Sequence, residues 1–243
     1  MPVQSEAWRS LRLIEPIDEG NRNEVWRARL DDVALDVSVR RSRRSVASLD
    51  WELDLIERLD ELGFMVPVPI RTDDGRRRDG DLVVQRWLHG RAPSTDGDWH
   101  RVAEELGRLH DATRSFRQRP GCSATPDLTR TSCSVDADMR VVPADVAEVT
   151  LSVFASFVDH PRSVLHGDPT ASNLRLDADG RVGLLDFDES RVDVAAHDLS
   201  NLGVQVLDDD AHRRAERLSN AWEAVNGWLV EREYARERYR SIR

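Results

Sequence analysis

The spacing of apolar residues changes near residue 90, and this change constrains the fold more than any other feature of the sequence. Residues 25–30 alternate between apolar and polar side chains, and residues 33–39 do so in part, so the two stretches predict a β-hairpin around Asp31 and Asp32. After Gly90 the apolar residues instead recur every three or four positions, which is typical of amphipathic helices. The pattern therefore predicts an α+β chain with a strand-rich first part and a larger, mainly helical second part.

One helix interrupts the strand-rich part. This helix is predicted from apolar residues spaced four or three positions apart, namely Trp51, Leu55, Leu59 and Leu62. We expect this helix to be capped near Ser48 and to end at Gly63, and we expect Asp98 to cap a later helix. Residues 114–140 are rich in Arg, Ser and Thr without a clear period, so they predict a long loop.

The composition excludes several classes of protein. Hydrophobic residues make up 40% of the 243 residues and charged residues 33%, which is typical of a globular chain. The formal net charge of −10 argues against binding of nucleic acid through bulk positive charge. No apolar run is long enough to span a membrane, and the first residues do not resemble a signal peptide. With Cys122 and Cys133 as the only cysteines, we expect no disulfide scaffold, no cysteine-rich zinc site and a reducing, cytoplasmic location.

Three polar residues flank a short predicted hairpin in the second half of the chain. Asp168 precedes the hairpin, Asn173 begins its first strand, and Asp186 follows its second strand. We expect strands over 173–176 and 181–185, which would bring the three side chains to one end of a small sheet. Two carboxylates and an amide oxygen are hard ligands that suit Mg²⁺ when phosphate oxygens complete its coordination.

The residues around this hairpin resemble the catalytic core of protein kinases and, more closely, that of the aminoglycoside phosphotransferase and choline kinase family. Residues 166–173 read HGDPTASN and residues 184–190 read LLDFDES, where the family has H-G-D-x-x-x-x-N and then I-D-F-D or I-D-W-D. Further similar segments span most of the chain, at residues 18–26, 51–53, 85–90, 104–110 and 197–199. The resemblance implies a bilobal protein-kinase-like fold with a small antiparallel β-sheet lobe over 1–86 and a larger, mainly helical lobe over 87–243.

The same resemblance implies a Mg²⁺-dependent phosphotransferase that moves the γ-phosphate of ATP or GTP to a hydroxyl group of a small molecule. Asp168 matches the residue that accepts the substrate proton or orients the nucleophile, and Asn173 and Asp186 match the metal ligands. The residues that would contact or support the nucleotide are Gly20, Glu52, Gln85 and Trp87. The expected partners are a nucleoside triphosphate and a small acceptor, without nucleic acid or membrane, and the sequence does not indicate an oligomeric state.

The sequence contains no lysine, and all 35 of its strongly basic residues are arginine. The strand lysine that is usual in the family is therefore missing; Arg40 is the best substitute, and Arg41 is close behind. Because a strand reverses face at each residue, only one of the two can point toward the nucleotide. If Arg40 does so, we expect it to pair with Glu52 of the following helix and to neutralise phosphate charge.

Two other functions are compatible with these residues. A kinase-like nucleotide-binding protein with weak or no transfer activity would account for the missing lysine. Residues 184–188 also fit the apolar-D-x-D motif of haloacid-dehalogenase phosphatases, although few residues follow for the rest of such a domain. The sequence leaves two roles for Asp188, as a metal ligand or as a cap. His166 is expected to brace its own loop through a hydrogen bond.

Two arginine-rich runs could suggest nucleic-acid binding, at residues 40–44 and 76–78. In a chain this acidic, solvated loops are the better interpretation. The residues that select the acceptor are expected within 114–140 and after residue 200, where no motif identifies the acceptor.

Overall fold

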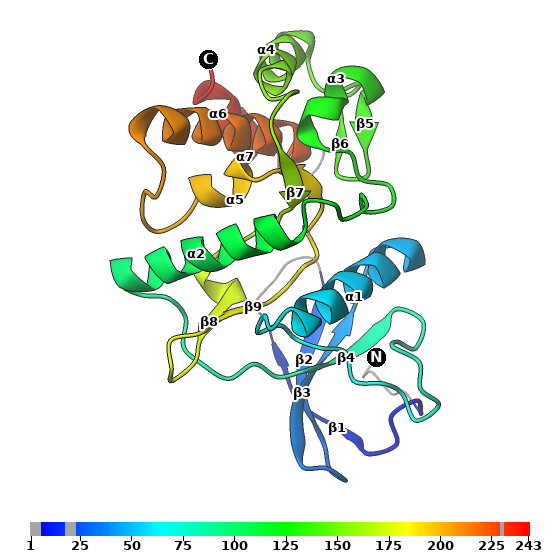
Figure 1. The fold of residues 1–243 in the computed structure, drawn as a ribbon. Coiled ribbons are helices and arrows are strands. Elements are labelled where there is room, and N and C mark those ends of the chain that lie inside the picture. Colours follow the sequence, from blue (N-terminus) through cyan, green and yellow to red (C-terminus); the bar gives the residue numbers. More distant parts are fainter. Residues whose placement is uncertain (1–5, 18–22, 229–230) are drawn as a thin grey trace. The chain divides into compact units, whose positions relative to one another are not determined.

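The computed structural model of the chain describes residues 6–17, 23–228 and 231–243 (Figure 1). The chain divides into two compact units. The first unit comprises residues 1–92 together with 171–188, so the hairpin predicted in the second half of the chain belongs with the N-terminal part. The second unit comprises residues 93–170 and 189–243.

The first unit is built on a four-stranded antiparallel sheet in the order β1-β2-β3-β4. Its strands are β1 (Leu11–Ile17), β2 (Glu24–Leu30), β3 (Leu35–Arg41) and β4 (Leu82–Arg86). β2 pairs with β3 along its whole length, which confirms the hairpin predicted from the alternation of residues 25–39.

The two faces of this sheet bury different partners. Val39 and Val84 lie opposite each other in β3 and β4 and pack with Trp8 on one face. Val83 points the other way and packs against Leu49 and Leu53 of helix α1 (Val46–Glu61). Because side chains alternate along a strand, every second residue of β3 also points toward the α1 face of the sheet.

Helix α1 begins three residues earlier than expected. Ser45 is its N-terminal cap, and the Ser45 hydroxyl accepts a hydrogen bond of 3.3 Å from the backbone N–H of Ser48, which lies inside the first turn. The prediction of the helix end is confirmed, because Gly63 follows the last turn with a left-handed backbone (φ +80°).

The hairpin of the first unit consists of the single turn η2 (Ala171–Asn173) and the strands β8 (Leu174–Leu176) and β9 (Val182–Leu184). The two strands pair as predicted, although each is shorter than expected and Asn173 lies in the turn before β8. The backbone N–H of Leu184 donates to the carbonyl of Met65 at 2.9 Å, which attaches the hairpin to the segment that follows α1.

The second unit is mainly helical. Its helices are α2 (Asp96–Ala112), η1 (Thr125–Asp127), α3 (Leu128–Thr131), α4 (Ala144–Ala155), α5 (Ala196–Ser200), α6 (Asp209–Asn226) and α7 (Arg232–Arg240). Its short strands are β5 (Cys133–Ser134), β6 (Ala137–Asp138), β7 (Arg162–Val164) and β10 (Val192–Val194), of which β5 pairs with β6 and β7 with β10. The core of this unit includes Phe154 of α4, Trp222 of α6 and Tyr239 of α7. No helix among the described residues is both long and apolar enough to cross a membrane.

Two expectations for the second unit differ from the structure. Thr95, not Asp98, caps helix α2, and the Asp98 carboxylate accepts a hydrogen bond of 3.1 Å from the backbone N–H of Thr95 in a capping box. Residues 114–140 are not one long loop, since they contain η1, α3 and the β5–β6 pair. Long-range contacts that a local periodicity does not report stabilise these short elements.

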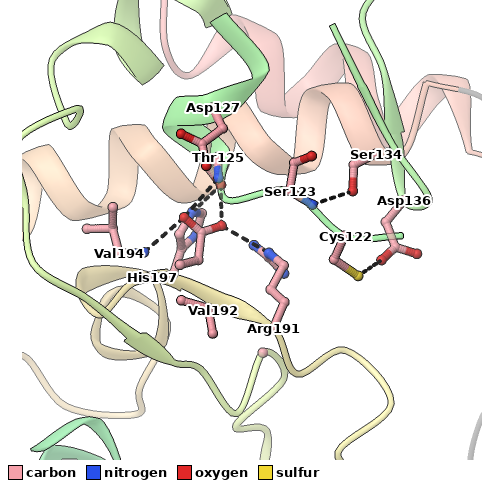
Figure 2. Close-up of polar contacts among 12 residues, drawn as sticks. Cys122, Ser123, Thr125, Asp127, Ser134, Asp136, Arg191, Val192, Val194 and His197 are labelled. Atoms are coloured by element: carbon pink, nitrogen blue, oxygen red, sulfur yellow. Dashed lines mark hydrogen bonds and ion pairs between the residues drawn. The ribbon is translucent and has the colours of Figure 1, made fainter. Parts of the chain in front are cut away.

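The strongest of these contacts is a buried polar cluster around Asp193 of β10. Its carboxylate accepts four hydrogen bonds: from the backbone N–H and the hydroxyl of Thr125 (2.9 and 2.6 Å), from Nε of Arg191 (3.0 Å) and from its neighbour Val194 (2.9 Å). His197 Nε2 lies 3.2 Å from the Thr125 hydroxyl, and Figure 2 shows Thr125, Arg191 and His197 converging here. The cluster ties η1 to β10, which are distant in sequence.

Candidate functional site

Strand register decides which arginine of β3 faces helix α1. Arg40 lies opposite Val83, and Val83 packs against α1, so Arg40 points the same way. Its guanidinium forms an ion pair with the carboxylate of Glu52, and the two residues are 5% and 1% exposed. Arg41 points away and pairs with Asp81 at 3.1 Å on a partly exposed surface. The predicted pairing of Arg40 with Glu52 is confirmed.

Arg40 has donor groups that Glu52 does not use. Nη2 contacts Glu52, whereas Nη1 lies 3.8 Å from Asp186 Oδ1 and 3.7 Å from Asp188 Oδ1, beyond hydrogen-bond distance. Both Nη1 and Nε are buried without a hydrogen bond. Burial alone would lower the pKa of Arg40, but the carboxylates of Glu52, Asp186 and Asp188 raise it above its ordinary value. The guanidinium is therefore a permanent cation with two unused N–H groups.

Arg40 lines a pocket of about 340 Å³ within the first unit. Polar side chains of Arg40, Glu52, Asn173 and Asp186 line one part of it. The apolar part is lined by Ile17, Val25, Ile56, Pro67, Leu88, Leu185 and Phe187. An enclosed surface that is apolar in one region and charged in another fits a ligand with an aromatic ring and an anionic group.

Asn173 and Asp186 reach the pocket from the two ends of the β8–β9 hairpin. The backbone N–H of Leu185 donates to the Asn173 carbonyl at 2.9 Å. Asp186 is the next residue after Leu185, so this hydrogen bond keeps Asp186 and Asn173 together where the chain enters and leaves the hairpin. Asp186 has a left-handed backbone (φ +54°), which is uncommon for a residue other than glycine and is found most often at functional positions. One carboxylate and one amide oxygen in the lining of the same pocket fit Mg²⁺, which binds few protein ligands and takes the rest from phosphate and water.

The side chains of Gln85 and Trp87, two other predicted nucleotide-binding residues, contact other parts of the protein. Gln85 and Trp87 line the pocket, but the amide of Gln85 is buried and donates to the Pro67 carbonyl at 3.1 Å, so it supports the wall. The side chain of Trp87 lies beneath the Arg27 guanidinium, 5.4 Å from the ring centre. Gly20 lies outside the described residues.

Asp168 belongs to the second unit, where Asp198 of α5 holds its loop. The Asp198 carboxylate accepts hydrogen bonds from the backbone N–H groups of His166 (2.8 Å) and Gly167 (2.9 Å), and His110 Nε2 lies 2.9 Å from it. Burial alone would raise the pKa of Asp198, but these hydrogen bonds, with that of His110 the largest, lower it. The loop therefore rests on a buried, charged acceptor.

The loop leaves no room for a side chain at Gly167. Its backbone is left-handed (φ +94°), and a Cβ atom there would lie 2.6 Å from the carbonyl oxygen of Glu189. His166 braces the loop as expected, because its carbonyl accepts a hydrogen bond of 2.8 Å from the Ser190 hydroxyl and its Nδ1 lies 3.4 Å from the Asp168 backbone N–H. The HGD motif is thus explained by backbone contacts on both sides of Gly167.

Sequence reasoning did not identify two contacts around the candidate residues, one in each unit. Asp198 stands in the H-D-L segment that resembles the family, but only the structure gives it the role of anchor for the Asp168 loop. Arg44 and Asp188 form an ion pair of 3.3 Å although 144 positions separate them. No periodicity or spacing in the sequence could indicate that pair.

The second arginine-rich run is bound to α1. Arg77 and Arg78 pair with Asp54 and Asp50 at 2.5 and 2.7 Å. These carboxylates project from the opposite side of the helix to Glu52. The guanidinium groups of Arg77 and Arg78 are thus paired with carboxylates of the same unit.

Comparison with known proteins gives the family and the fold of the chain. The model of the phosphotransferase enzyme family (APH) matches residues 13–236. No curated protein matches the chain significantly by sequence. The choline kinase LicA from Streptococcus pneumoniae has 16% identity and a TM-score of 0.63, covering 94% of this chain and 93% of its own.

Two further solved structures have the same fold. The aminoglycoside phosphotransferase APH(4)-Ia has 14% identity and a TM-score of 0.67, with 98% of this chain and 95% of that chain covered. An ethanolamine kinase from Plasmodium vivax has 14% identity and a TM-score of 0.66, with 99% of this chain and 84% of that chain covered. At these identities the likeness concerns the fold.

The antiparallel sheet with helix α1 and the β8–β9 hairpin of the first unit, and the mainly helical second unit, are the elements of a kinase-like fold, and the predicted α+β, protein-kinase-like fold is confirmed. The chain belongs to the phosphotransferase enzyme family. This membership excludes the haloacid-dehalogenase alternative for residues 184–188, since these residues form the end of a hairpin in a kinase-like fold.

Proposed function

We propose that this protein transfers the γ-phosphate of ATP or GTP to a hydroxyl group of a small molecule in a Mg²⁺-dependent reaction. The observation that carries the proposal is the pocket of the first unit, which Arg40, with its unused donors, lines together with Asn173 and Asp186. Family membership supports small-molecule phosphotransfer as the reaction class. Related structures were solved with ADP and hygromycin B and with AMP, which supports a nucleotide as the ligand of this pocket.

In the proposed complex, the apolar wall near Val25 and Leu88 contacts the purine, and Arg40 contacts the phosphates. A guanidinium presents its donors in fixed directions within one plane, and with Nη2 directed at Glu52, Nη1 and Nε are left as donors for phosphate oxygens on different sides of the group. Glu52 keeps this fork in place, because a buried arginine without its carboxylate partner would be strongly destabilised. Arg40 would thus supply the positive charge of the family's lysine, but with donors whose directions are fixed by the planar guanidinium.

Asn173 and Asp186 would hold Mg²⁺ with one neutral and one anionic oxygen ligand. When bound, the ion neutralises phosphate charge and aligns the phosphate for transfer. Asp168 would accept the proton of the acceptor hydroxyl or orient that hydroxyl for attack, while its loop is held by Asp198. Most of the rate enhancement would then come from positioning and charge neutralisation.

Testing the reaction requires the acceptor. The purified protein is incubated with Mg²⁺ and ATP or GTP and with aminoglycosides, macrolides, choline, ethanolamine, homoserine or simple sugars, and phosphorylated products are detected by mass spectrometry. The first compounds in this panel are those named for proteins with the same fold, including a macrolide 2′-phosphotransferase from Brachybacterium faecium. We expect a product with one acceptor class and about 10²–10⁴-fold slower formation in Asp168→Ala.

The main competing function is nucleotide binding without transfer. It would be favoured if calorimetry shows binding of Mg·ATP or Mg·GTP while no acceptor in the panel yields a product. Absence of nucleotide binding would contradict both functions.

A further inference from the structure

Asp188 is the second carboxylate of the segment Asp186-Phe187-Asp188, and two arginines contact it. Arg44, in the connection between β3 and α1, donates from Nε to Asp188 Oδ2 at 3.3 Å. Arg40 Nη1 lies 3.7 Å from Asp188 Oδ1, the other oxygen of the carboxylate. The side chains of Arg44 and Asp188 are 12% and 7% exposed. Each carboxylate oxygen thus faces a different, shielded cation.

Asp188 is also connected to the proposed metal ligand. Its backbone N–H donates to Asp186 Oδ1 at 3.3 Å, so the position of residue 188 influences the orientation of the Asp186 carboxylate. Asp186 has the left-handed backbone described above, a conformation that persists only when surrounding contacts hold it. The contacts therefore run from Arg44 to the Asp188 carboxylate, and from the Asp188 backbone to Asp186.

We propose, on the basis of the proposed function, that Asp188 is not a metal ligand but the anchor of the turn that presents Asp186, and that Arg44 is the positioning residue that holds this anchor. A carboxylate between two guanidinium groups has its charge neutralised and its orientation set by them. Moving it to a metal would break a shielded ion pair and leave Arg44 without this partner, which is costly for a mostly buried charge.

The two interpretations of Asp188 predict opposite effects of removing Arg44. If Asp188 is the anchor, Arg44→Gln loosens the turn and weakens metal binding at Asp186. If Asp188 is a ligand, the same substitution frees a carboxylate for the metal and strengthens binding. Loss of a residue that orients a metal ligand typically weakens metal affinity by about 10–100-fold.

The test measures metal affinity directly, without turnover. Mn²⁺ binding to the ADP-saturated protein is followed by electron paramagnetic resonance, and ADP binding without metal by calorimetry, for wild type, Arg44→Gln, Arg44→Lys, Asp188→Asn and the control Arg43→Gln. Arg43 is a matched control because it neighbours Arg44 and is exposed. We expect about tenfold weaker Mn²⁺ binding in Arg44→Gln, partial recovery in Arg44→Lys, no change in Arg43→Gln and metal-free ADP affinity within about twofold of wild type.

The double variant Arg44→Gln/Asp188→Asn shows whether Mn²⁺ affinity falls through loss of the Arg44–Asp188 contact or through a general loss of folding. If the two residues act as one unit, the double variant binds Mn²⁺ about as weakly as the worse single variant. The anchoring role of Asp188 would be contradicted if Arg44→Gln bound Mn²⁺ as tightly as wild type or more tightly, or if the losses of Mn²⁺ affinity in the two single variants added up in the double variant. Either result would leave the proposed function intact. A wild-type protein that binds no metal–nucleotide complex would instead overturn the proposed function and, with it, the anchor.

Discussion

Each unit of the molecule buries an arginine beside a carboxylate, but the two pairs differ in how many hydrogen-bonding groups they leave unused. In the second unit, the Asp193 carboxylate accepts four hydrogen bonds, and Arg191 donates one of them while stacking 3.9 Å from the ring centre of Trp222. In the first unit, Arg40 contacts Glu52 through one nitrogen and leaves Nε and Nη1 without hydrogen bonds.

The difference separates a structural cluster from a binding site. Buried polar groups in folded proteins nearly always have partners, and an exception needs an explanation such as a ligand. The Asp193 cluster has its partners within the unit and links η1 with β10, so its contribution is to stability. Arg40, by contrast, lines a pocket, which is why we propose that a ligand supplies the partners of its unused donors.

The largest expected effect is the loss of the Asp193 carboxylate. Asp193→Ala leaves Arg191 buried without its acceptor and should reduce the free energy of unfolding by about 3–5 kcal/mol, measured by urea denaturation at pH 7. Nucleotide affinity of the folded protein should stay within about twofold of wild type. If Asp193→Ala does not fold, Thr125→Val removes one hydrogen bond and should cost about 1–2 kcal/mol. A loss below about 1 kcal/mol in both variants would contradict the structural role.

The same cluster should make stability depend on pH. Burial, the largest cause, lowers the pKa of His197 from 6.5 to about 4, despite the opposing effect of Asp193. The unfolded chain therefore gains a proton at this residue below pH 6.5, whereas the folded protein does not until about pH 4. The free energy of unfolding should fall by about 3 kcal/mol from pH 7 to pH 4. The lowered pKa values of Asp193 and Asp198 add to this loss only from about pH 5 downward, because carboxylates of the unfolded chain begin to protonate there.

Urea denaturation between pH 7 and pH 4 measures this dependence. His197→Gln should flatten it, and the exposed His100→Gln should leave it unchanged. An equal slope in wild type and His197→Gln would assign the pH dependence to other groups.

A matched pair of conservative substitutions sharpens the contrast between the two arginines. Arg40→Lys keeps the charge near Glu52 but loses the fork of donors, so nucleotide affinity should fall about tenfold, or about 1.4 kcal/mol, with partial activity retained. Arg191→Lys loses the stacking on Trp222 and the Nε hydrogen bond, so it should reduce stability by about 1–2 kcal/mol without changing nucleotide affinity. Calorimetry and urea denaturation of both variants provide the four values.

Arg41→Lys is the control for the first of these substitutions, because Arg41 pairs with Asp81 away from the pocket. If it weakened nucleotide binding as much as Arg40→Lys, the strand register would not explain the choice between the two arginines.

The smallest effect is expected on the exposed side of α1. Arg77 and Asp54 form an ion pair of 2.5 Å, but their side chains are 23% and 38% exposed. A double-mutant cycle with Arg77→Ala and Asp54→Ala should give a coupling below about 1 kcal/mol that decreases with added salt. A salt-independent coupling above about 2 kcal/mol would mean that exposure alone does not distinguish this pair from the buried one.

Much of the first unit could be predicted from local patterns. Alternation in β3 predicts that Arg40 and Arg41 face opposite ways, and the following helix places Glu52 where Arg40 can reach it. The Arg40–Glu52 contact could be predicted because strands and helices have fixed periods and only 12 positions separate the two residues.

Contacts between distant segments could not be predicted in the same way. Ser48 and Asp98 were expected to be caps because polar residues are common throughout the first helical turn, and only backbone geometry identifies Ser45 and Thr95 as the capping residues. Likewise, the short elements within 114–140 depend on Asp193, which is 68 positions from Thr125. The roles of candidate site residues such as Asp168 remain predictions that the variants above address.

An arginine at the position of Arg40 also changes which covalent reagents can label the pocket. Nucleotide analogues that acylate a pocket lysine need a nucleophilic amine, and a guanidinium stays protonated and does not react with them. Because no side chain among the 243 residues carries a primary amine, such analogues have no side-chain target anywhere in this chain. Dicarbonyl reagents, which condense with guanidinium groups, are the appropriate chemical probes, and a bound nucleotide would shield Arg40 from them.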